Sequence, residues 1–427
     1  MWKVGRTSNP LVENAAALYA VQLAGYALPL ITIPFLARVL HPDGFGLLVL
    51  AQSLALWLSI LFEYGFGLSA TRAVASHRDD PARVAETVAG VMGAKSLLFL
   101  GVAIIALLAA ATVPAFRRHP EYIVWAWLQT IALGFSPFWY FQGTERMVRP
   151  AVLEVAARAL ATAAMFFVVR ASDDGWKVLA LQASAGLTST GVPLLWLYRE
   201  VPWRRPRLAQ ALSALRSGWG MFVFRGAHSL YTTMNVVILG LFVPTRAVGY
   251  YGGAERIARA VLNLLTPLSQ ALYPRISHLT KRDPREAGGL ARLGLMLIAG
   301  VGLVSGAGMA LAAPLAVRIV VGPGYEASIP VLRGLALLVP LSGASTVLAM
   351  QWLFPVGKER TVTAVILAGG VLNVGLALLL APHFGQMGMV WAVVAAELFI
   401  FSALAWCVRH RLVRRGERPP VSAPAWR

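Results

Sequence analysis

Two long apolar runs occupy the middle of the chain: GMFVFRGAHSLYTTMNVVILGLFV at residues 220–243 and YYGGAERIARAVLNLLTPLSQALYPRI at residues 250–276. Each run is long enough to cross a bilayer as a helix, which takes about 20 apolar residues. Polar side chains recur in both runs every three or four positions, so in a helix they share one face. The polar positions are Arg225, His228, Thr232 and Asn235 in the first run, and Arg256, Arg259, Asn263, Thr266 and Gln270 in the second.

The arginines on these faces are costly inside a membrane. On insertion scales, one arginine at the centre of a helix costs about 2.5–3.5 kcal/mol. Arg225, Arg256 and Arg259 are tolerated if they face water, partner side chains or an anionic cargo instead of lipid. We therefore expect the two helices to line a cationic, water-filled cavity inside a helical bundle.

The composition of the whole chain agrees with a membrane protein. Of its 427 residues, 58% are hydrophobic and only 13% are charged, whereas an ordinary soluble domain carries about 25% charged residues. The apolar runs are too long for barrel strands, so the predicted fold is an all-α polytopic membrane protein with about 12 transmembrane helices. The single cysteine, Cys407, excludes an intramolecular disulfide and a cysteine metal cluster. No metal and no cofactor are expected.

The formal charge of +19 has two interpretations, nucleic-acid binding or membrane topology. Most lysines and arginines fall in alternate loops and at the two ends, which is the distribution that the positive-inside rule describes. We therefore expect no nucleic-acid partner, an even number of crossings, and cytoplasmic N- and C-termini. Lys95, early in the third crossing, is expected to extend to the cytoplasmic surface.

The two halves of the chain resemble each other. WYFQGTER at residues 139–146 is matched by WLFPVGKER at residues 352–360, about half a chain later. A repeat with an even number of crossings per half implies two six-helix lobes related by an axis along the membrane normal. The predicted boundaries are residues 1–207 for the first lobe, 208–410 for the second, and 411–427 for a basic cytoplasmic tail.

Four segments carry a resemblance to a known family: LITIPFLARVLHPDGFG (30–46), EYGFGLSATR (63–72), VGYYGGAERIAR (248–259) and LSQALYPR (268–275). The chain resembles the Wzx-type polysaccharide flippases, which translocate O-antigen and exopolysaccharide repeat units and belong to the multidrug/oligosaccharidyl-lipid/polysaccharide exporter superfamily. The resemblance implies a V-shaped transporter of the inner (cytoplasmic) membrane, and no enzyme. It would move an undecaprenyl-pyrophosphate-linked oligosaccharide from the cytoplasmic to the periplasmic leaflet by alternating access. Its partners would be this lipid-linked cargo, membrane lipids and other polysaccharide-assembly proteins.

Such a cargo would give each polar face a role. Guanidinium groups match phosphate geometry with paired donors, so Arg225, Arg256 and Arg259 would bind the pyrophosphate. Candidates for hydrogen bonds to the glycan are Gln22, Tyr26, Asn235, Asn263 and Gln270, and candidates for proton coupling are Glu63, His228 and Glu255. The competing interpretation is structural: the arginines would form inter-lobe ion pairs with Glu63, Glu154 or Glu397, and Arg259 would pair with Glu255 one turn away.

Three other functions stay open. A drug or organic-cation antiporter of the same superfamily would need carboxylates in the cleft, where this chain has arginines. A lipid II flippase would share the cationic cleft but usually has more crossings than this chain. A membrane glycan polymerase or ligase would need a sizeable periplasmic loop with catalytic groups, and the expected periplasmic loops are short.

Overall fold

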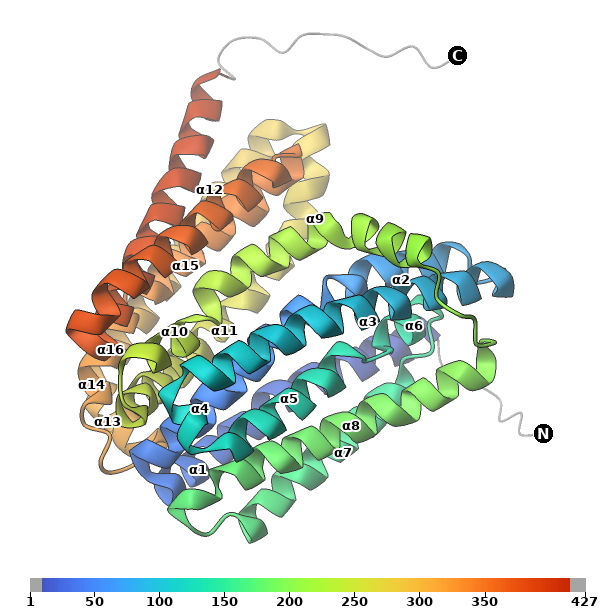
Figure 1. The fold of residues 1–427 in the computed structure, drawn as a ribbon. Helices are drawn as coiled ribbons and strands as arrows, with labels where there is room; N and C mark the ends of the chain where they lie inside the picture. Colours follow the sequence, from blue (N-terminus) through green and yellow to red (C-terminus); the bar gives the residue numbers. More distant parts are fainter. Residues whose placement is uncertain (1–9, 415–427) are drawn as a thin grey trace.

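The computed structural model describes residues 10–414, apart from the side chains of some residues in that range, Tyr26, His228 and Gln270 among them. The described residues are helical almost throughout and contain no strand, which confirms the predicted all-α fold (Figure 1). The α-helices are α1 (Pro10–Glu63), α2 (Phe66–Ser76), α3 (Pro81–Thr112), α4 (Pro114–Arg118), α5 (Pro120–Gly134), α6 (Phe138–Gly143), α7 (Val148–Val168), α8 (Gly175–Glu200), α9 (Leu208–Thr232), α10 (Asn235–Phe242), α11 (Thr245–Arg282), α12 (Pro284–Leu311), α13 (Ala313–Val320), α14 (Ser328–Leu335), α15 (Leu338–Val347) and α16 (Glu359–Arg414).

The two longest helices each contain a reversal of the chain. In α1 the backbone breaks at His41, whose φ is 54° and ψ is 172°. The residue before a proline is disfavoured in the helical region, and Pro42 itself has no amide hydrogen to donate, so the break falls at this point. In α16 the break lies at Gly385, shortly after Pro382. Each of these helices therefore supplies two crossings.

Length and composition mark seven segments of the described chain as able to span a membrane. Two of them contain the reversals in α1 and α16. Other crossings escape this criterion because they are interrupted or polar: α5 is separated from α6 by residues 135–137, α9 from α10 by Thr233 and Met234, and α11 carries the polar face described above. The chain is thus a polytopic membrane protein with about 12 crossings, as the hydropathy pattern predicts.

The lobes meet closely at the end of the bundle where the chain turns at His41 and at Pro244. There the second half of α1 packs on α11. A Cβ at Gly46 would overlap the carbonyl oxygen of Thr245, and a Cβ at Gly249 would overlap the carbonyl oxygen of Pro42. Glycine at both positions lets the two backbones touch, which is the usual role of small residues between membrane helices.

Helix α9 connects the two lobes along its length. Its first turn packs on α3, where Gly90 faces Gln210 and Gly93 faces Pro206 and Ala211. The same helix also packs on α16, and Figure 1 shows it lying between the helices of the first and second halves. The lobe boundary at residues 207/208 stays a prediction, because the first helix after it contacts both sides. The end of the predicted tail, residues 415–427, lies outside the described residues.

Candidate functional site

The guanidinium of Arg256 lies between the lobes. Its Nη2 donates to Oε1 of Gln52 at 2.5 Å, and Gln52 Nε2 donates in turn to Oε1 of Gln182 at 2.9 Å. The guanidinium also lies 5.0 Å from the centre of the Phe45 ring, within reach of a cation–π interaction. Because the hydrogen-bond acceptor is a neutral amide, this contact does not itself neutralise the positive charge, and the carboxylate of the adjacent Glu255 is engaged by Arg259.

The depth of this contact follows from helix geometry. Gln52 lies about three turns beyond the start of its crossing at Pro42, and Arg256 lies about three turns beyond Thr245, where α11 begins. Three turns are about 16 Å, which is close to half of a hydrocarbon core about 30 Å thick. The Gln52–Arg256 contact therefore joins α1 to α11 near the middle of the membrane.

One turn further along α11, Arg259 is held by two oxygens. Its Nη2 donates to Oε1 of Glu255 at 2.8 Å and to the carbonyl oxygen of Thr232 at the end of α9. The predicted pairing of Glu255 with Arg259 is therefore confirmed. The side chain of Arg259 is nevertheless 44% exposed, so part of the guanidinium still faces outward from this pair.

Arg225 forms an ion pair between the lobes. Its Nη1 lies 2.5 Å from Oε2 of Glu63, whose other oxygen accepts the amide hydrogen of Gly67 at 2.7 Å. Glu63 lies about six turns beyond Pro42, or about 32 Å, which places the pair near the opposite membrane surface. Beside it, the rings of Tyr64 and Phe222 stack at 4.3 Å. For Arg225, the ion pair with Glu63 expected by the structural interpretation is present.

The other predicted site residues lie in different environments. Asn235 is buried, and its Oδ1 accepts a hydrogen bond from Nδ2 of Asn373 at 2.6 Å, which joins α10 to α16. Asn263 and Gln22 are exposed. The side chains predicted at Tyr26, His228 and Gln270 lie outside the described part of the chain. A glycan contact at these positions stays a prediction, and at Asn235 it would require the bond to Asn373 to open.

The remaining charged side chains of the crossings mostly interact with groups of the chain itself. Glu154 and Arg158 pair one turn apart on α7 at 2.5 Å. Glu397 is buried, with no arginine among its hydrogen-bond or ion-pair partners in the described residues. The expectation that Lys95 extends to the surface is wrong. This side chain is fully buried and its Nζ donates to the carbonyl oxygens of Gly134 and Ser136, at 2.6 and 3.1 Å. Those carbonyls lie where α5 ends and need a donor, which the ammonium supplies.

A pocket that the sequence did not indicate lies between α2, α3 and the first turns of α9. Its volume is about 400 Å³. Its lining is mainly apolar and also carries five hydroxyl or amide side chains: Ser69, Thr87, Gln210, Ser213 and Ser217. Isolated serines and threonines carry no sequence signal, since they also occur throughout ordinary membrane helices. Only the packing of three distant segments gathers them around one space.

Comparisons with known proteins agree with this architecture. A family model described as polysaccharide biosynthesis protein matches residues 11–280, more than half of the chain. A curated relative from Escherichia coli (strain K12), named "Putative O-antigen transporter", is 28% identical over 403 residues, covering 94% of this chain and 97% of the relative. A relative of the same name from Shigella dysenteriae is 26% identical over 394 residues, covering 91% and 97%.

Two solved structures share the fold. The lipid II flippase MurJ in its inward closed conformation superposes with a TM-score of 0.72 at 12% identity, covering 93% of this chain and 87% of that chain. An inward-facing multidrug resistance MATE transporter of the MOP superfamily gives a TM-score of 0.63 at 13% identity, covering 95% and 100%. These likenesses confirm the predicted two-lobed exporter fold.

Proposed function

Because the chain belongs to the polysaccharide biosynthesis protein family, we propose that it moves undecaprenyl-pyrophosphate-linked oligosaccharide repeat units from the cytoplasmic to the periplasmic leaflet. Both relatives are named as O-antigen transporters, which supports a role as a polysaccharide repeat-unit flippase. The exporter fold supports alternating access between the two lobes. The protein would lie in the cytoplasmic membrane with both termini on the cytoplasmic side, as its charge distribution predicts.

The observation that carries this proposal is the inter-lobe contact between Arg256 and Gln52. Moving a pyrophosphate and sugar hydroxyls through hydrocarbon is prohibitive, since these groups would lose their hydrogen bonds to water. A guanidinium near the middle of the membrane offers an anion a paired donor at the most costly point of the path. Its present partner is a neutral amide, which a phosphate oxygen can displace without leaving a buried carboxylate unpaired.

The two ion pairs would add further anion-binding steps. The guanidinium of Arg259 lies one turn from Arg256, and that of Arg225 lies closer to the membrane surface. An incoming pyrophosphate would compete with Glu255 and Glu63 for them. Protonation of Glu63 would free Arg225 and weaken the bridge between the lobes, which gives a route for coupling transport to a proton gradient.

Of the alternatives, the cation antiporter is disfavoured, because Arg256 and Arg259 place two positive charges beside the single carboxylate of Glu255. A lipid II flippase shares both the fold and the cationic path, so only the cargo distinguishes it. A polymerase or ligase would change the length of the glycan rather than its leaflet. Purified protein in vesicles, given either a lipid-linked O-antigen unit or lipid II, separates these functions by measuring leaflet exchange and glycan length together.

The decisive variants are Arg256→Ala and Arg256→Lys. If Arg256 binds pyrophosphate, the alanine variant loses most leaflet exchange while the lysine variant keeps part of it, since lysine retains the charge but not the paired donors. Leu264→Ala, on the same helix and 74% exposed, is the control for a cargo-neutral change in packing. Wild-type exchange by Arg256→Ala in a correctly inserted protein would remove the pyrophosphate role.

A further inference from the structure

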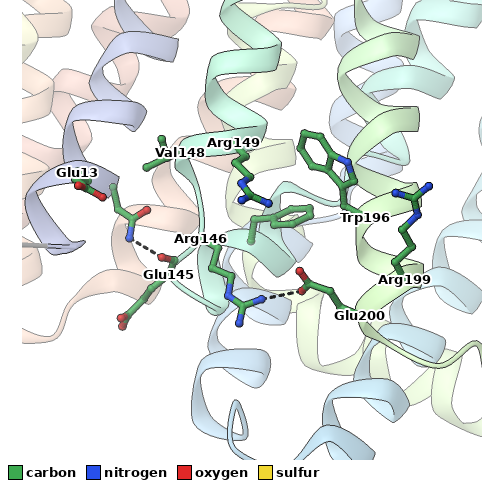
Figure 2. A pocket seen from close by; sticks show the side chains of 10 residues that line it. Glu13, Glu145, Arg146, Val148, Arg149, Trp196, Arg199 and Glu200 are labelled. Atoms are coloured by element: carbon green, nitrogen blue, oxygen red, sulfur yellow. Dashed lines mark hydrogen bonds and ion pairs between the residues drawn. The ribbon is translucent and has the colours of Figure 1, made fainter. Parts of the chain in front are cut away.

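A second pocket lies at the end of the first lobe, away from the contacts between the lobes. Its volume is about 540 Å³, and it is enclosed by the start of α1, the turn between α6 and α7, and the end of α8. Figure 2 shows Arg149, Trp196 and Arg199 in one row, with the ion pair of Arg146 and Glu200 beneath them.

The carboxylates in the lining are already engaged. Glu200 accepts from Nη1 of Arg146 at 3.0 Å and from the Tyr140 hydroxyl at 3.0 Å. Glu145 pairs with Arg78 at 3.1 Å, and Glu13 also has a partner. The acidic groups are therefore not available to neutralise the remaining cations of the pocket.

Those cations are Arg149 and Arg199. Both line the pocket and are exposed, and neither makes a hydrogen bond or an ion pair with its side chain in the part of the chain that the structure describes. They come from neighbouring antiparallel helices, since Arg149 lies at the start of α7 and Arg199 at the end of α8. Two unpaired guanidinium groups on one pocket favour a ligand that carries negative charge.

The pocket lies at the level of the lipid headgroups. The 21 residues of α7 and the 26 residues of α8 extend about 32 and 39 Å, so each reaches across a hydrocarbon core about 30 Å thick. The two arginines at their ends are therefore near the membrane surface. Trp196, half-buried in the lining, is a residue type enriched at this level.

One helical turn from each of the two arginines, on the same face of its helix, lies an exposed apolar side chain that faces lipid. Val152 follows Arg149 by one turn on the same face of α7 and is 62% exposed. Leu195 precedes Arg199 by one turn on the same face of α8 and is 63% exposed. A cationic pocket with open apolar faces beneath it matches a molecule with an anionic head and hydrocarbon chains.

We propose that this pocket binds the headgroup of an anionic phospholipid of the surrounding leaflet. Its phosphodiester would lie between Arg149 and Arg199, and its acyl chains would lie along Val152 and Leu195. The site is separate from the inter-lobe path. The bound lipid is therefore a specifically bound membrane lipid and not the transported cargo. It would attach the outer helices of the first lobe to one leaflet.

Native mass spectrometry of the purified full chain, titrated with phosphatidylglycerol or phosphatidylcholine, tests this site. The test variant is Arg149→Gln/Arg199→Gln. The matched control is Arg117→Gln/Arg118→Gln on α4, which removes two exposed arginines at the other end of the bundle. The site predicts that the test variant binds the first phosphatidylglycerol about tenfold or more weakly, and that the control binds it as the wild type does. Arg149→Lys/Arg199→Lys should retain most of the binding.

Several outcomes would overturn the proposal. These are unchanged phosphatidylglycerol affinity in the test variant, an equal loss in the α4 control, or equal affinity of the wild type for phosphatidylcholine. Glycerol phosphate and inorganic phosphate form a separate arm of the titration. If either binds as tightly as phosphatidylglycerol, the pocket recognises free phosphate and not a lipid. Both variants should unfold thermally and elute as the wild type does. A loss of binding then reflects the altered site and not a loss of folding.

Discussion

The close contact between α1 and α11 at two glycines leads to a specific prediction about how the lobes move. In the described structure Gly46 lies against the carbonyl oxygen of Thr245, and Gly249 lies against that of Pro42. We expect Gly46→Ala and Gly249→Ala to push these helices apart at this end of the bundle. A backbone oxygen cannot rotate away from a new methyl group as a flexible side chain could.

The size of the effect follows from the overlap. To restore ordinary van der Waals contact the helices must separate by a distance on the order of 1 Å, and overpacking of this kind costs about 1–3 kcal/mol. A cost of about 2 kcal/mol changes the ratio of two conformations by about 30-fold. Each variant should therefore depopulate the arrangement in which α1 and α11 touch. If transport alternates between that arrangement and one open at this end, leaflet exchange slows as well.

Distances between spin labels measure the shift directly. Cys407 is the only cysteine in the sequence, so its replacement by serine gives a cysteine-free background for labels at Ser172 and Glu326. Both positions are exposed and lie in connections between long helices at this end of the bundle. The alanine variants should move the distance distribution to longer values.

Gly300→Ala is the control, because a Cβ at Gly300 meets no atom within 4 Å. It should leave both the distances and the exchange rate unchanged. Wild-type distances and wild-type exchange in Gly46→Ala and Gly249→Ala would refute the idea that these glycines permit a contact needed for transport.

Three further predictions concern individual contacts. Lys95→Ala should lower the free energy of unfolding by about 2–4 kcal/mol, because one buried and one partly buried carbonyl lose a charged donor. Lys358→Ala at an exposed position should have little effect, and equal unfolding curves for the two variants would contradict this prediction. Asn373→Ala should lower the free energy of unfolding by about 1–3 kcal/mol, since buried Asn235 loses a hydrogen-bond donor. The measurement compares the unfolding of this variant with that of Asn263→Ala, which should unfold as the wild type does. Glu63→Gln and Arg225→Gln should show a coupling of about 1 kcal/mol in a double-mutant cycle, because the pair is charged but partly exposed; additive effects would mean that the ion pair contributes nothing.

The crossings and the polar faces could be predicted because they depend on local properties of the chain. A run of about 20 apolar residues is sufficient to indicate a membrane helix, and helical periodicity places Arg225, Arg256 and Arg259 on polar faces without further knowledge. The pairing of Glu255 with Arg259 was predictable for the same reason, since one turn separates them.

Partners from distant segments could only come from the packed structure. Gln52 and Arg256, or Lys95 and the end of α5, are brought together by the crossing of helices whose relative rotation and depth have no local signal. Lys95 shows how this misleads. A lysine early in a crossing is expected to extend toward the surface, but this one lies in the middle of α3 and donates to carbonyls at the end of α5.

The pocket at Arg149 and Arg199 has the same origin. Each arginine alone looks like one more positive loop residue, and it is the antiparallel packing of α7 on α8 that places both on one cavity. Sequence therefore determined which segments enter the membrane and which faces are polar, because hydropathy and period act over a few turns. Beyond local pairs such as Glu255 and Arg259, tertiary structure decided which charges are neutralised, because that depends on atoms brought within a few ångströms from opposite parts of the chain.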